Sequence, residues 1–330
     1  SEALFTDGLE VAGTGRNQEI GKELSDHGIR FKTADISSPE QLKGAFCSAD
    51  CVVHCAARVG DWGVFDEFYQ ANVIGTRNVI AACRHHNVHR VIFISTPSVY
   101  VDGRDRFDIL ESEPLPTRQL THYSSTKLVA EQELLSLANE GFEVIILRPR
   151  AVYGLHDKNF IPRIKRMATK KRFPLIAGGK AIVDVTYVDN LVDVVRAALT
   201  APSSAWNEVY NVTNGDPLPI ARWFEKMVGV LGLPFRPKKV PEPAAWTMAA
   251  LMEAAIRLPF CPKQPLMTRF AVRYMARSMT LSTVKAAERL SYQPRFSTQG
   301  SFSDYSKRLC DQKESFGGIP NECARAGNET

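Results

Sequence analysis

Residues 91–100 read VIFISTPSVY, an apolar run that ends abruptly in hydroxyl-bearing side chains. Its first part, Val91–Ser95, is rich in β-branched and aromatic residues and has the length of one buried strand. Four similar runs occur in the first 150 residues of the chain. They are Leu9–Ala12, Ile29–Lys32, Cys51–His54 and Val144–Leu147.

Stretches long enough for helices separate these five runs. They are Gln18–Asp26, Pro39–Ser48, Asp66–His86 and Ser124–Asn139. Apolar strands that alternate with helical crossovers are typical of a parallel sheet covered on both faces. We therefore predict an α/β fold with a Rossmann-like, doubly wound parallel sheet over residues 1–150. Ligands of such sheets bind beyond the carboxyl ends of the strands, so candidate functional residues follow each strand.

The alternation of strands and helices weakens after Pro149, and segments rich in proline take its place. The apolar stretches Ala244–Leu258 and Leu266–Met279 predict helices that form a core, a pocket lid or a membrane-surface contact. We predict a mixed substrate-binding region over residues 151–310 that partly returns to the sheet. Residues 311–330 are polar and contain glycine, so we expect a poorly ordered tail.

Composition places the 330-residue chain among ordinary globular proteins, since 44% of its residues are hydrophobic and 23% are charged. The net charge of +5 is scattered, with a dense basic run only at Lys165–Arg172, which argues against a nucleic-acid partner. No apolar run is long enough for a transmembrane span and no leader peptide opens the sequence, so we expect a cytoplasmic protein.

The seven cysteines are an odd and dispersed set, which predicts reduced thiols rather than a disulfide framework. Cys47, Cys51 and Cys55 lie close together in the sequence, but no second pair of ligands follows them. We therefore predict no metal site.

The strongest local motif is Tyr123-Ser124-Ser125-Thr126-Lys127. Residues four apart lie on one face of a helix, so Tyr123 and Lys127 can project into the same site. A tyrosine hydroxyl titrates near 10, and it carries protons poorly at neutral pH unless a cation stabilises the phenolate. Lowering its pKa by about 2–3 units takes about 3–4 kcal/mol, which an ammonium in a water-poor cleft can supply. The pair alone is equally compatible with a solvated helix edge.

Thr96 and Ser98 follow the predicted strand Val91–Ser95 and are therefore placed at its carboxyl end. A hydroxyl there can hydrogen-bond a substrate carbonyl and hold it against Tyr123. An ordinary turn before Pro97 would explain the same residues. A strand-end hydroxyl that precedes a Tyr-x-x-x-Lys helix in an α/β sheet is much more specific than either feature by itself.

Further segments extend this pattern over nearly the whole chain. They are VVHCAARVGDWG (Val52–Gly63), ANVIGTRNVIAAC (Ala71–Cys83), STPSVY (Ser95–Tyr100), YSSTK (Tyr123–Lys127), LRPRAVYG (Leu147–Gly154), DVTYVDN (Asp184–Asn190), YNVTNGDPL (Tyr210–Leu218) and YQPR (Tyr292–Arg295). In this order they resemble an extended short-chain dehydrogenase/reductase. Within that superfamily the chain is most similar to the 3β-hydroxysteroid dehydrogenase group, which includes bacterial 2-alkyl-3-ketoalkanoate reductases.

The resemblance implies that Tyr123 is the general acid/base and that Lys127 lowers its pKa and holds the nicotinamide ribose. It implies that Thr96 is the catalytic hydroxyl, with Ser95 beside it as a fallback. The other positions that it places along the cofactor are Asp35, Ile36, Ala56, Ala57, Arg58, Asn72, Ser95, Pro149, Ala151 and Val152. Asn72 matches the asparagine of the dimer-forming helix, where helix packing is an equal alternative.

The choice between NAD and NADP depends on the residues that follow the run Leu9–Ala12. An acidic residue there would accept the ribose hydroxyls of NAD, whereas an arginine would favour the 2′-phosphate of NADP. The chain reads Gly13-Thr14-Gly15-Arg16-Asn17, with no carboxylate and one arginine. This leans toward NADP through Arg16, although a solvated arginine would look the same.

The family opens with a strand and a glycine-rich turn that brings the pyrophosphate to a helix N-terminus. Gly13-Thr14-Gly15 is the only candidate for that turn, but the third glycine would fall at Gln18. The later motifs place this segment at the end of the family's second strand. We therefore expect roughly 20 preceding residues to be absent, so that two neighbouring strands lack backbone partners. An incomplete start explains this better than a degraded relative does, because Thr96, Tyr123 and Lys127 are intact.

The predicted function is an oxidoreductase that interconverts a 3-hydroxy and a 3-keto group on a bulky apolar substrate, either sterol-like or a 2-alkyl-3-keto acid. Trp62, Ser98 and the apolar helices after Pro243 are candidate substrate contacts.

Two alternatives stay open at this point. A nucleotide-sugar epimerase or dehydratase shares the fold and the Tyr/Lys pair, but the apolar stretch Ala244–Leu258 argues against the polar site that it needs. A non-catalytic binding protein without a phosphate-binding loop is the alternative from another class. A homodimer is implied by the resemblance only, and peripheral contact with a membrane also stays open.

Overall fold

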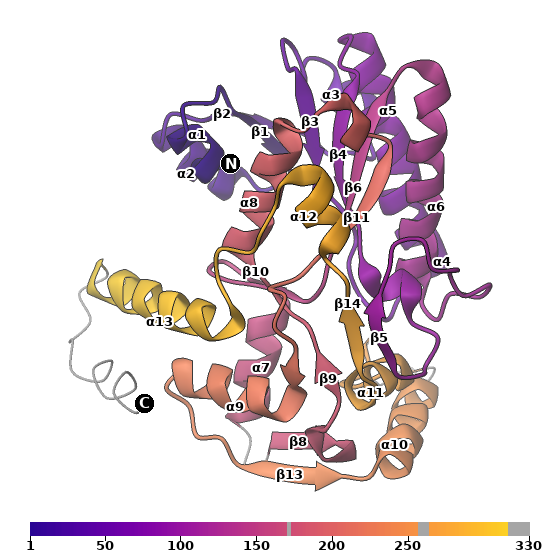
Figure 1. The fold of residues 1–330 in the computed structure, drawn as a ribbon, viewed down its shortest axis with the longest axis vertical. Helices are drawn as coiled ribbons and strands as arrows, with labels where there is room; N and C mark the ends of the chain where they lie inside the picture. Colours follow the sequence, from indigo (N-terminus) through magenta and orange to yellow (C-terminus); the bar gives the residue numbers. More distant parts are fainter. Residues whose placement is uncertain (170–172, 257–263, 316–330) are drawn as a thin grey trace.

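The computed structural model describes residues 1–169, 173–256 and 264–315, and its fold is drawn in Figure 1. Four parallel strands form the main sheet in the order β11-β6-β4-β3. Val91, Ile92 and Phe93 are fully buried at its centre, as continuously apolar strands predict. The four strands are β3 (Cys51–His54), β4 (Arg90–Ile94), β6 (Glu143–Pro149) and β11 (Glu208–Val212). The predicted doubly wound sheet is confirmed, with three of these strands within two residues of their expected bounds.

Helices cover both faces of the main sheet. On one face their buried side chains pack in one cluster with Phe93, and on the other face in a second cluster with Ile92. The first face is covered by α3 (Pro39–Leu42), α5 (Gly75–His85) and α6 (His122–Ser136), and the second by α8 (Val188–Leu199) and α12 (Val284–Leu290). The predicted helix Asp66–His86 is divided into α4 (Phe65–Tyr69), the π-helical η1 (Gln70–Ile74) and α5.

Two further strands, β1 (Ala12–Gly15) and β2 (Arg30–Thr33), form a separate parallel pair. Among the described residues β1 pairs only with β2 and β3 only with β4, so the predicted interruption of the sheet is present. The placement of Gly13-Thr14-Gly15 at the end of a strand agrees with β1, whereas the expected strand Leu9–Ala12 is wrong by three residues. The reason is packing, because a Cβ on Gly13 would lie 3.2 Å from the ring of Phe31.

The C-terminal region is built from short sheets and helices below the main sheet in Figure 1. It rejoins the first part of the chain, since β14 (Met279–Leu281) pairs with β5 (Arg106–Ile109) and β9 (Ile182–Val183). The remaining strands of this region are β7 (Val152–Tyr153), β8 (Phe173–Ile176), β10 (Thr186–Tyr187), β12 (Leu218–Pro219) and β13 (Pro237–Val240). Its helices are α7 (Phe160–Ala168), α9 (Ile220–Val230), α10 (Glu242–Ala255), α11 (Arg269–Ala276) and α13 (Thr298–Ser315).

Three expectations about this region need correction. The helix predicted over Leu266–Met279 is shorter, because Met279 begins strand β14. The tail predicted from residue 311 is helical to Ser315, and residues 316–330 lie outside the described part. Leu258, the last residue of the helix predicted over Ala244–Leu258, also lies outside it. Cys47, Cys51, Cys55 and Cys83 are free thiols as predicted, whereas Cys310 is disulfide-bonded.

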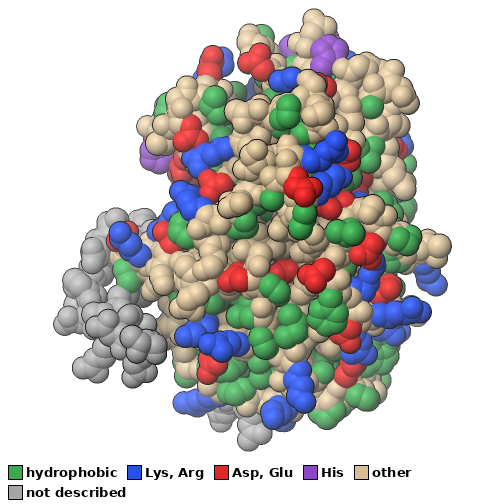
Figure 2. All heavy atoms as spheres, in the orientation of Figure 1, with side chains coloured by type: hydrophobic (Ala, Val, Ile, Leu, Met, Phe, Trp, Pro, Cys, Tyr) green, Lys and Arg blue, Asp and Glu red, His purple; other side chains and the backbone are tan. Residues whose placement is uncertain are grey.

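The remaining helical segments are short. They are α1 (Glu2–Thr6), α2 (Gln18–Asp26), η2 (Pro97–Tyr100), η3 (Leu137–Glu140), η4 (Ala177–Gly179) and η5 (Ser203–Ala205). Along the described ranges, none of the helices has an apolar run long enough to cross a lipid bilayer. On the face drawn in Figure 2, basic and acidic side chains are interspersed, and hydrophobic side chains gather over the C-terminal region.

Candidate active site

Helix α6 begins directly before Tyr123, at the edge of the sheet where β4 ends. The side chain of Thr121 fixes this start, because its Oγ1 accepts a hydrogen bond of 3.0 Å from the backbone N–H of Ser124. Ser124 Oγ in turn accepts from the Thr121 backbone N–H, which completes a capping box. Tyr123 therefore lies in the first turn of α6, and Lys127 follows one turn later on the same face.

Lys127 is buried against β4, with 1% of its surface exposed. Its Nζ donates a 2.7 Å hydrogen bond to the carbonyl oxygen of Ile94 and lies 3.6 Å from the ring centroid of Phe93. Burial lowers the pKa of Lys127 to about 7, against the opposing effects of Glu131 and Cys55. The amine is thus held beneath the end of β4 in surroundings that disfavour its charged form.

Tyr123 is half-buried, and its hydroxyl lies near Thr96 at the end of β4. Burial raises the pKa of Tyr123 to about 12, the Thr96 hydroxyl lowers it, and the charges of Tyr274 and Glu131 raise it further. The ammonium of Lys127 contacts Ile94 O and the ring of Phe93. The lowering of the phenol pKa by Lys127 stays a prediction.

The strand-end hydroxyls form a compact group. Thr96 Oγ1 lies 2.9 Å from Ser98 Oγ and accepts a 3.2 Å hydrogen bond from the Ser98 backbone N–H, which starts the short helix η2. Ser95 is buried, and within the described residues its hydroxyl has no hydrogen-bond partner. A buried hydroxyl costs free energy unless a partner satisfies it, so Ser95 fits a site that binds a polar group.

Asn72 lies on η1 and ties the segment after β3 to helix α6. Its Oδ1 accepts from the Arg58 backbone N–H at 2.8 Å, and its Nδ2 donates to Arg58 O at 3.1 Å and to Thr126 Oγ1 at 3.0 Å. The amide of Asn72 thus fixes the backbone of Arg58 against helix α6. Ala56 is exposed directly beyond the strand, where its small side chain leaves room for a ligand.

Arg16 and Asp35 face each other at the ends of β1 and β2. Arg16 Nη1 lies 3.6 Å from Asp35 Oδ2, and the side chain of Arg16 is 80% exposed. Asp35 accepts from the backbone and hydroxyl of Ser37, each at 2.8 Å, and its pKa is lowered mainly by the backbone bond. Ile36 approaches Gly75 so closely that a Cβ there would lie 2.7 Å from its side chain.

The other predicted positions are dispersed around the same edge. Pro149 ends β6, Ala151 has a positive φ of 44° and Val152 begins β7. Trp62 lies in a different place, where it lines a cleft of about 900 Å³ together with Trp246, Phe270 and the outer side of α6. The structure therefore unites Ser95, Thr96, Ser98, Tyr123 and Lys127, and it places Arg16, Asp35 and Trp62 apart from them.

Sequence reasoning missed a buried polar network behind the catalytic helix. Glu131 and Arg148 are 1% and 4% exposed and form an ion pair, with Arg148 Nε 3.1 Å from Glu131 Oε1. Arg148 also donates to the hydroxyl of Tyr100 at 2.6 Å, which donates to Asn211 at 3.0 Å. The spacing of Lys127 and Glu131, again four residues, is the one signal in the sequence that could have indicated it.

Comparison with known proteins identifies the relatives of this chain. The NAD dependent epimerase/dehydratase family matches residues 1–213. A 2-alkyl-3-oxoalkanoate reductase of Shewanella oneidensis is 30% identical over 88% of this chain and 78% of its own length. A 3beta-hydroxysteroid-dehydrogenase/decarboxylase of Arabidopsis thaliana is 30% identical over 83% of this chain and 65% of its own length.

The fold also has solved counterparts. A UDP-glucuronic acid 4-epimerase from Bacillus cereus, solved in complex with NAD, superposes with a TM-score of 0.70 at 22% identity and covers 93% of this chain and 94% of its own. At that identity the likeness concerns the fold alone. Taken with the ordered motifs and the Thr96–Tyr123–Lys127 geometry, the family match over residues 1–213 shows that the chain belongs to the NAD dependent epimerase/dehydratase family.

Proposed function

We propose that this chain is an NAD(P)-dependent oxidoreductase that interconverts a 3-hydroxy and a 3-keto group on a bulky apolar substrate, with a 2-alkyl-3-keto acid favoured over a sterol. The observation that carries the proposal is that Tyr123 lies near Thr96 at the end of β4, while Lys127, one turn later on α6, binds the carbonyl oxygen of Ile94 in the same strand. The names of the curated relatives support the same reaction class.

Bound nicotinamide would supply or accept the hydride. The hydroxyls of Thr96 and Tyr123 would donate hydrogen bonds to the substrate carbonyl oxygen, which stabilises the negative charge that develops on it. Because the pKa of Tyr123 is raised to about 12, the phenol holds its proton at neutral pH. It therefore carries a proton for the oxygen in the direction of ketone reduction, and efficient transfer would require bound cofactor and the charged form of Lys127 to lower its pKa.

Lys127 and Ser95 are the residues that would hold the ribose next to the nicotinamide. Both are buried, and the hydroxyl of Ser95 lacks a partner among the described residues. A ribose hydroxyl beside them would satisfy Ser95 and share the ammonium with Ile94 O. An oxygen acceptor in that place would stabilise the charged form of Lys127, which burial alone disfavours.

We also propose that NADP is preferred to NAD. Arg16 is mostly exposed at the end of β1, and its contact with Asp35 is long at 3.6 Å. An exposed guanidinium can turn to a phosphate and bind it through two parallel hydrogen bonds. Ser37 engages Oδ1 of Asp35, and within the described residues Oδ2 has only the long contact with Arg16.

A cleft on the outer side of α6 has a volume of about 900 Å³, in the range of ligand sites. Trp62, Trp246, Leu128 and Phe270 give it apolar surface, which supports a bulky apolar substrate. Tyr123 and Thr96 do not line this cleft, so the substrate would have to extend from it to the end of β4.

Exposed apolar side chains elsewhere support two further proposals. Val64 and Phe65 are 62% and 42% exposed, which supports a homodimer. Leu251 is 66% exposed, which supports contact with a membrane surface.

The direct test is NADPH oxidation by the full chain with a 2-alkyl-3-oxo acid, compared in parallel with a UDP-sugar in a thermal-shift assay. We expect turnover of the oxo acid and no stabilisation by the UDP-sugar. Turnover of the oxo acid that survives Tyr123→Phe would contradict the assignment, and stabilisation by the UDP-sugar alone would favour an epimerase.

A further inference from the structure

Helix α10 (Glu242–Ala255), which the structure describes in full, presents an outward face without a charged side chain. The exposed residues of this face are Pro243, Ala244, Thr247, Met248, Leu251 and Ala254. The one hydroxyl among them is satisfied within the helix, because Thr247 Oγ1 donates to the carbonyl oxygen of Pro243 at 3.0 Å. Helix α9 of the same region instead exposes Arg222, Glu225 and Lys226. An exposed helix face of this composition favours contact with an apolar partner.

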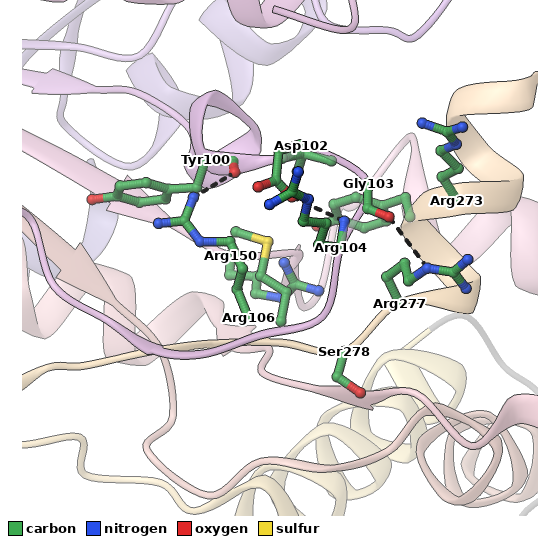
Figure 3. Close-up of a pocket in the computed structure, with 12 residues that line it drawn as sticks. Tyr100, Asp102, Gly103, Arg104, Arg106, Arg150, Arg273, Arg277 and Ser278 are labelled. Atoms are coloured by element: carbon green, nitrogen blue, oxygen red, sulfur yellow. Dashed lines mark hydrogen bonds between the residues drawn. The ribbon is translucent and has the colours of Figure 1, made fainter. Parts of the chain in front are cut away.

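The two charged residues of α10 are both used inside the fold. Glu242 accepts from Arg277 Nη1 at 2.6 Å, and Arg277 Nε also donates to the carbonyl oxygen of Gly103 at 3.2 Å (Figure 3). Glu253 accepts from the backbone N–H and from Nε of Arg269, each at 2.7 Å. These bonds fix α10 on α11, and they leave the uncharged face free of charged neighbours from its own helix.

Strand β13 adds exposed cations next to this face. It leads directly into α10 along the lower edge of the molecule in Figure 1, and its last residue, Val240, packs against the apolar cluster that contains Ala245 of α10. Lys238 and Lys239 are exposed, and neither forms an ion pair within the described ranges. Lys239 precedes Ala244 by five residues, a chain length that spans at most about 18 Å. Figure 2 likewise shows basic side chains along the lower edge, beside the hydrophobic ones of the C-terminal region.

We propose that α10 and β13 form a docking surface for a membrane with anionic headgroups. Met248 and Leu251, which are 44% and 66% exposed, insert among the lipids, and Lys238 and Lys239 lie at the headgroups. A second copy of the chain fits this face less well. Each partner of a stable protein interface contributes about 20–30 residues, far more than one helix face offers.

Another side of α10 borders the cleft of about 900 Å³, because Trp246 and Glu253 line that cleft. Docking through α10 therefore brings the cleft next to a lipid surface, where a bulky apolar substrate accumulates. The inference deepens the membrane contact proposed above, and it rests on the proposed function for the nature of the substrate. Binding to the membrane itself does not depend on the reaction.

Flotation of the full chain with lipid vesicles tests this surface. The vesicles consist of phosphatidylcholine alone or of phosphatidylcholine with anionic phosphatidylglycerol, and the wild type should float mainly with the anionic vesicles. The double variant Lys238→Gln/Lys239→Gln should weaken this binding by about 10- to 30-fold, because two cations near the headgroups are lost. Leu251→Gln should weaken it by about tenfold, because an apolar side chain no longer enters the lipid.

Matched controls change similar side chains elsewhere on the surface. They are Lys22→Gln/Lys307→Gln, which removes two exposed lysines of α2 and α13, and Val284→Gln on α12, where the valine is 57% exposed. Both controls should float like the wild type. Equal losses in a control and its matched variant overturn the proposal, and so does a wild type that floats with neither kind of vesicle or equally with both.

Two further measurements separate the alternatives. Analytical ultracentrifugation without lipid that shows a wild-type dimer and a Leu251→Gln monomer would place a second copy on this face and overturn the proposal. Turnover is measured through NADPH oxidation by the wild type with a water-soluble, short-chain 2-alkyl-3-oxo acid. Vesicle binding without this turnover refutes the proposed reaction and leaves the docking surface standing, whereas turnover without vesicle binding refutes the docking surface alone.

Discussion

The end of strand β4 and the end of strand β1 differ sharply in how deeply their side chains are buried. At the end of β4, Lys127 is 1% exposed and Phe93 beneath it is fully buried, within a sheet of four paired strands. At the end of β1, Arg16 is 80% exposed, and the two strands of that sheet contain no buried residue. The reacting end is thus rigidly preorganised, whereas the end that would select between NAD and NADP depends on exposed and adaptable side chains.

The largest expected effect comes from removing the phenol at the rigid end. Tyr123→Phe should lower the turnover number for ketone reduction by about 10²- to 10⁴-fold, because the proton donor is lost. The melting temperature should stay nearly the same, because the exchange removes one hydroxyl and keeps the aromatic ring. Steady-state kinetics and thermal melting of the full chain check both statements. A turnover number within tenfold of the wild type would contradict the role of Tyr123.

The buried pair behind this end should matter most for stability. Glu131→Gln leaves the guanidinium of Arg148 buried without its partner, which should cost about 3–5 kcal/mol of unfolding free energy. Glu133→Gln is the matched control, because Glu133 lies on the same helix and pairs with Arg77 at the surface. It should cost about 0–1 kcal/mol. Urea unfolding measures the unfolding free energy of both variants. Equal losses in Glu131→Gln and Glu133→Gln would contradict a larger contribution from the buried pair.

The pH dependence of thermal stability can be compared between the wild type and a variant at Lys127. Its pKa is lowered to about 7 in the folded chain from an ordinary 10.5, so the unfolded chain binds more protons between these values and stability rises with pH there. Lys127→Met removes this dependence. Its melting temperature should exceed that of the wild type most clearly at pH 6, with a smaller advantage toward pH 10, while turnover falls by about 10²-fold. If the melting-temperature advantage of Lys127→Met grew with pH, the lowered pKa of Lys127 would be contradicted.

The smallest effect is expected at the exposed end. Arg16→Gln should raise the KM for NADPH by about tenfold and leave the KM for NADH within about twofold, because only the 2′-phosphate loses a partner. Arg84→Gln, which removes an exposed arginine elsewhere, serves as the control. Parallel rises in both KM values would show that Arg16 does not select the cofactor.

The comparison also explains what could be predicted from the sequence. The bounds of Cys51–His54 were predictable because a strand of the sheet has a continuous apolar run. The position of Thr96 at the end of β4 followed from the hydroxyl residues that end the run Val91–Ser95. The strand at Ala12–Gly15 was misplaced, because the close packing of Gly13 on Phe31 leaves no local signal.

Long-range contacts were beyond reach for a related reason. The direction of the Lys127 ammonium depends on Ile94 and Phe93, which are more than thirty residues away in the chain. The pairing of Glu131 with Arg148 likewise depends on how several elements pack together. Periodicity and spacing describe single elements, so they indicate which residues face a site but not which partners these residues find there.

The protonation of Tyr123 is the point on which the proposed reaction depends most directly. It can be measured by NMR of the full chain with ¹³Cζ-labelled tyrosine, with Tyr123→Phe used to assign the signal. Without added cofactor, the phenol of Tyr123 should stay protonated at pH 10, where an ordinary tyrosine is half ionised, because burial raises its pKa to about 12. A phenolate signal from Tyr123 at pH 7 to 8 would contradict the raised pKa and would show that the protein alone already stabilises the phenolate.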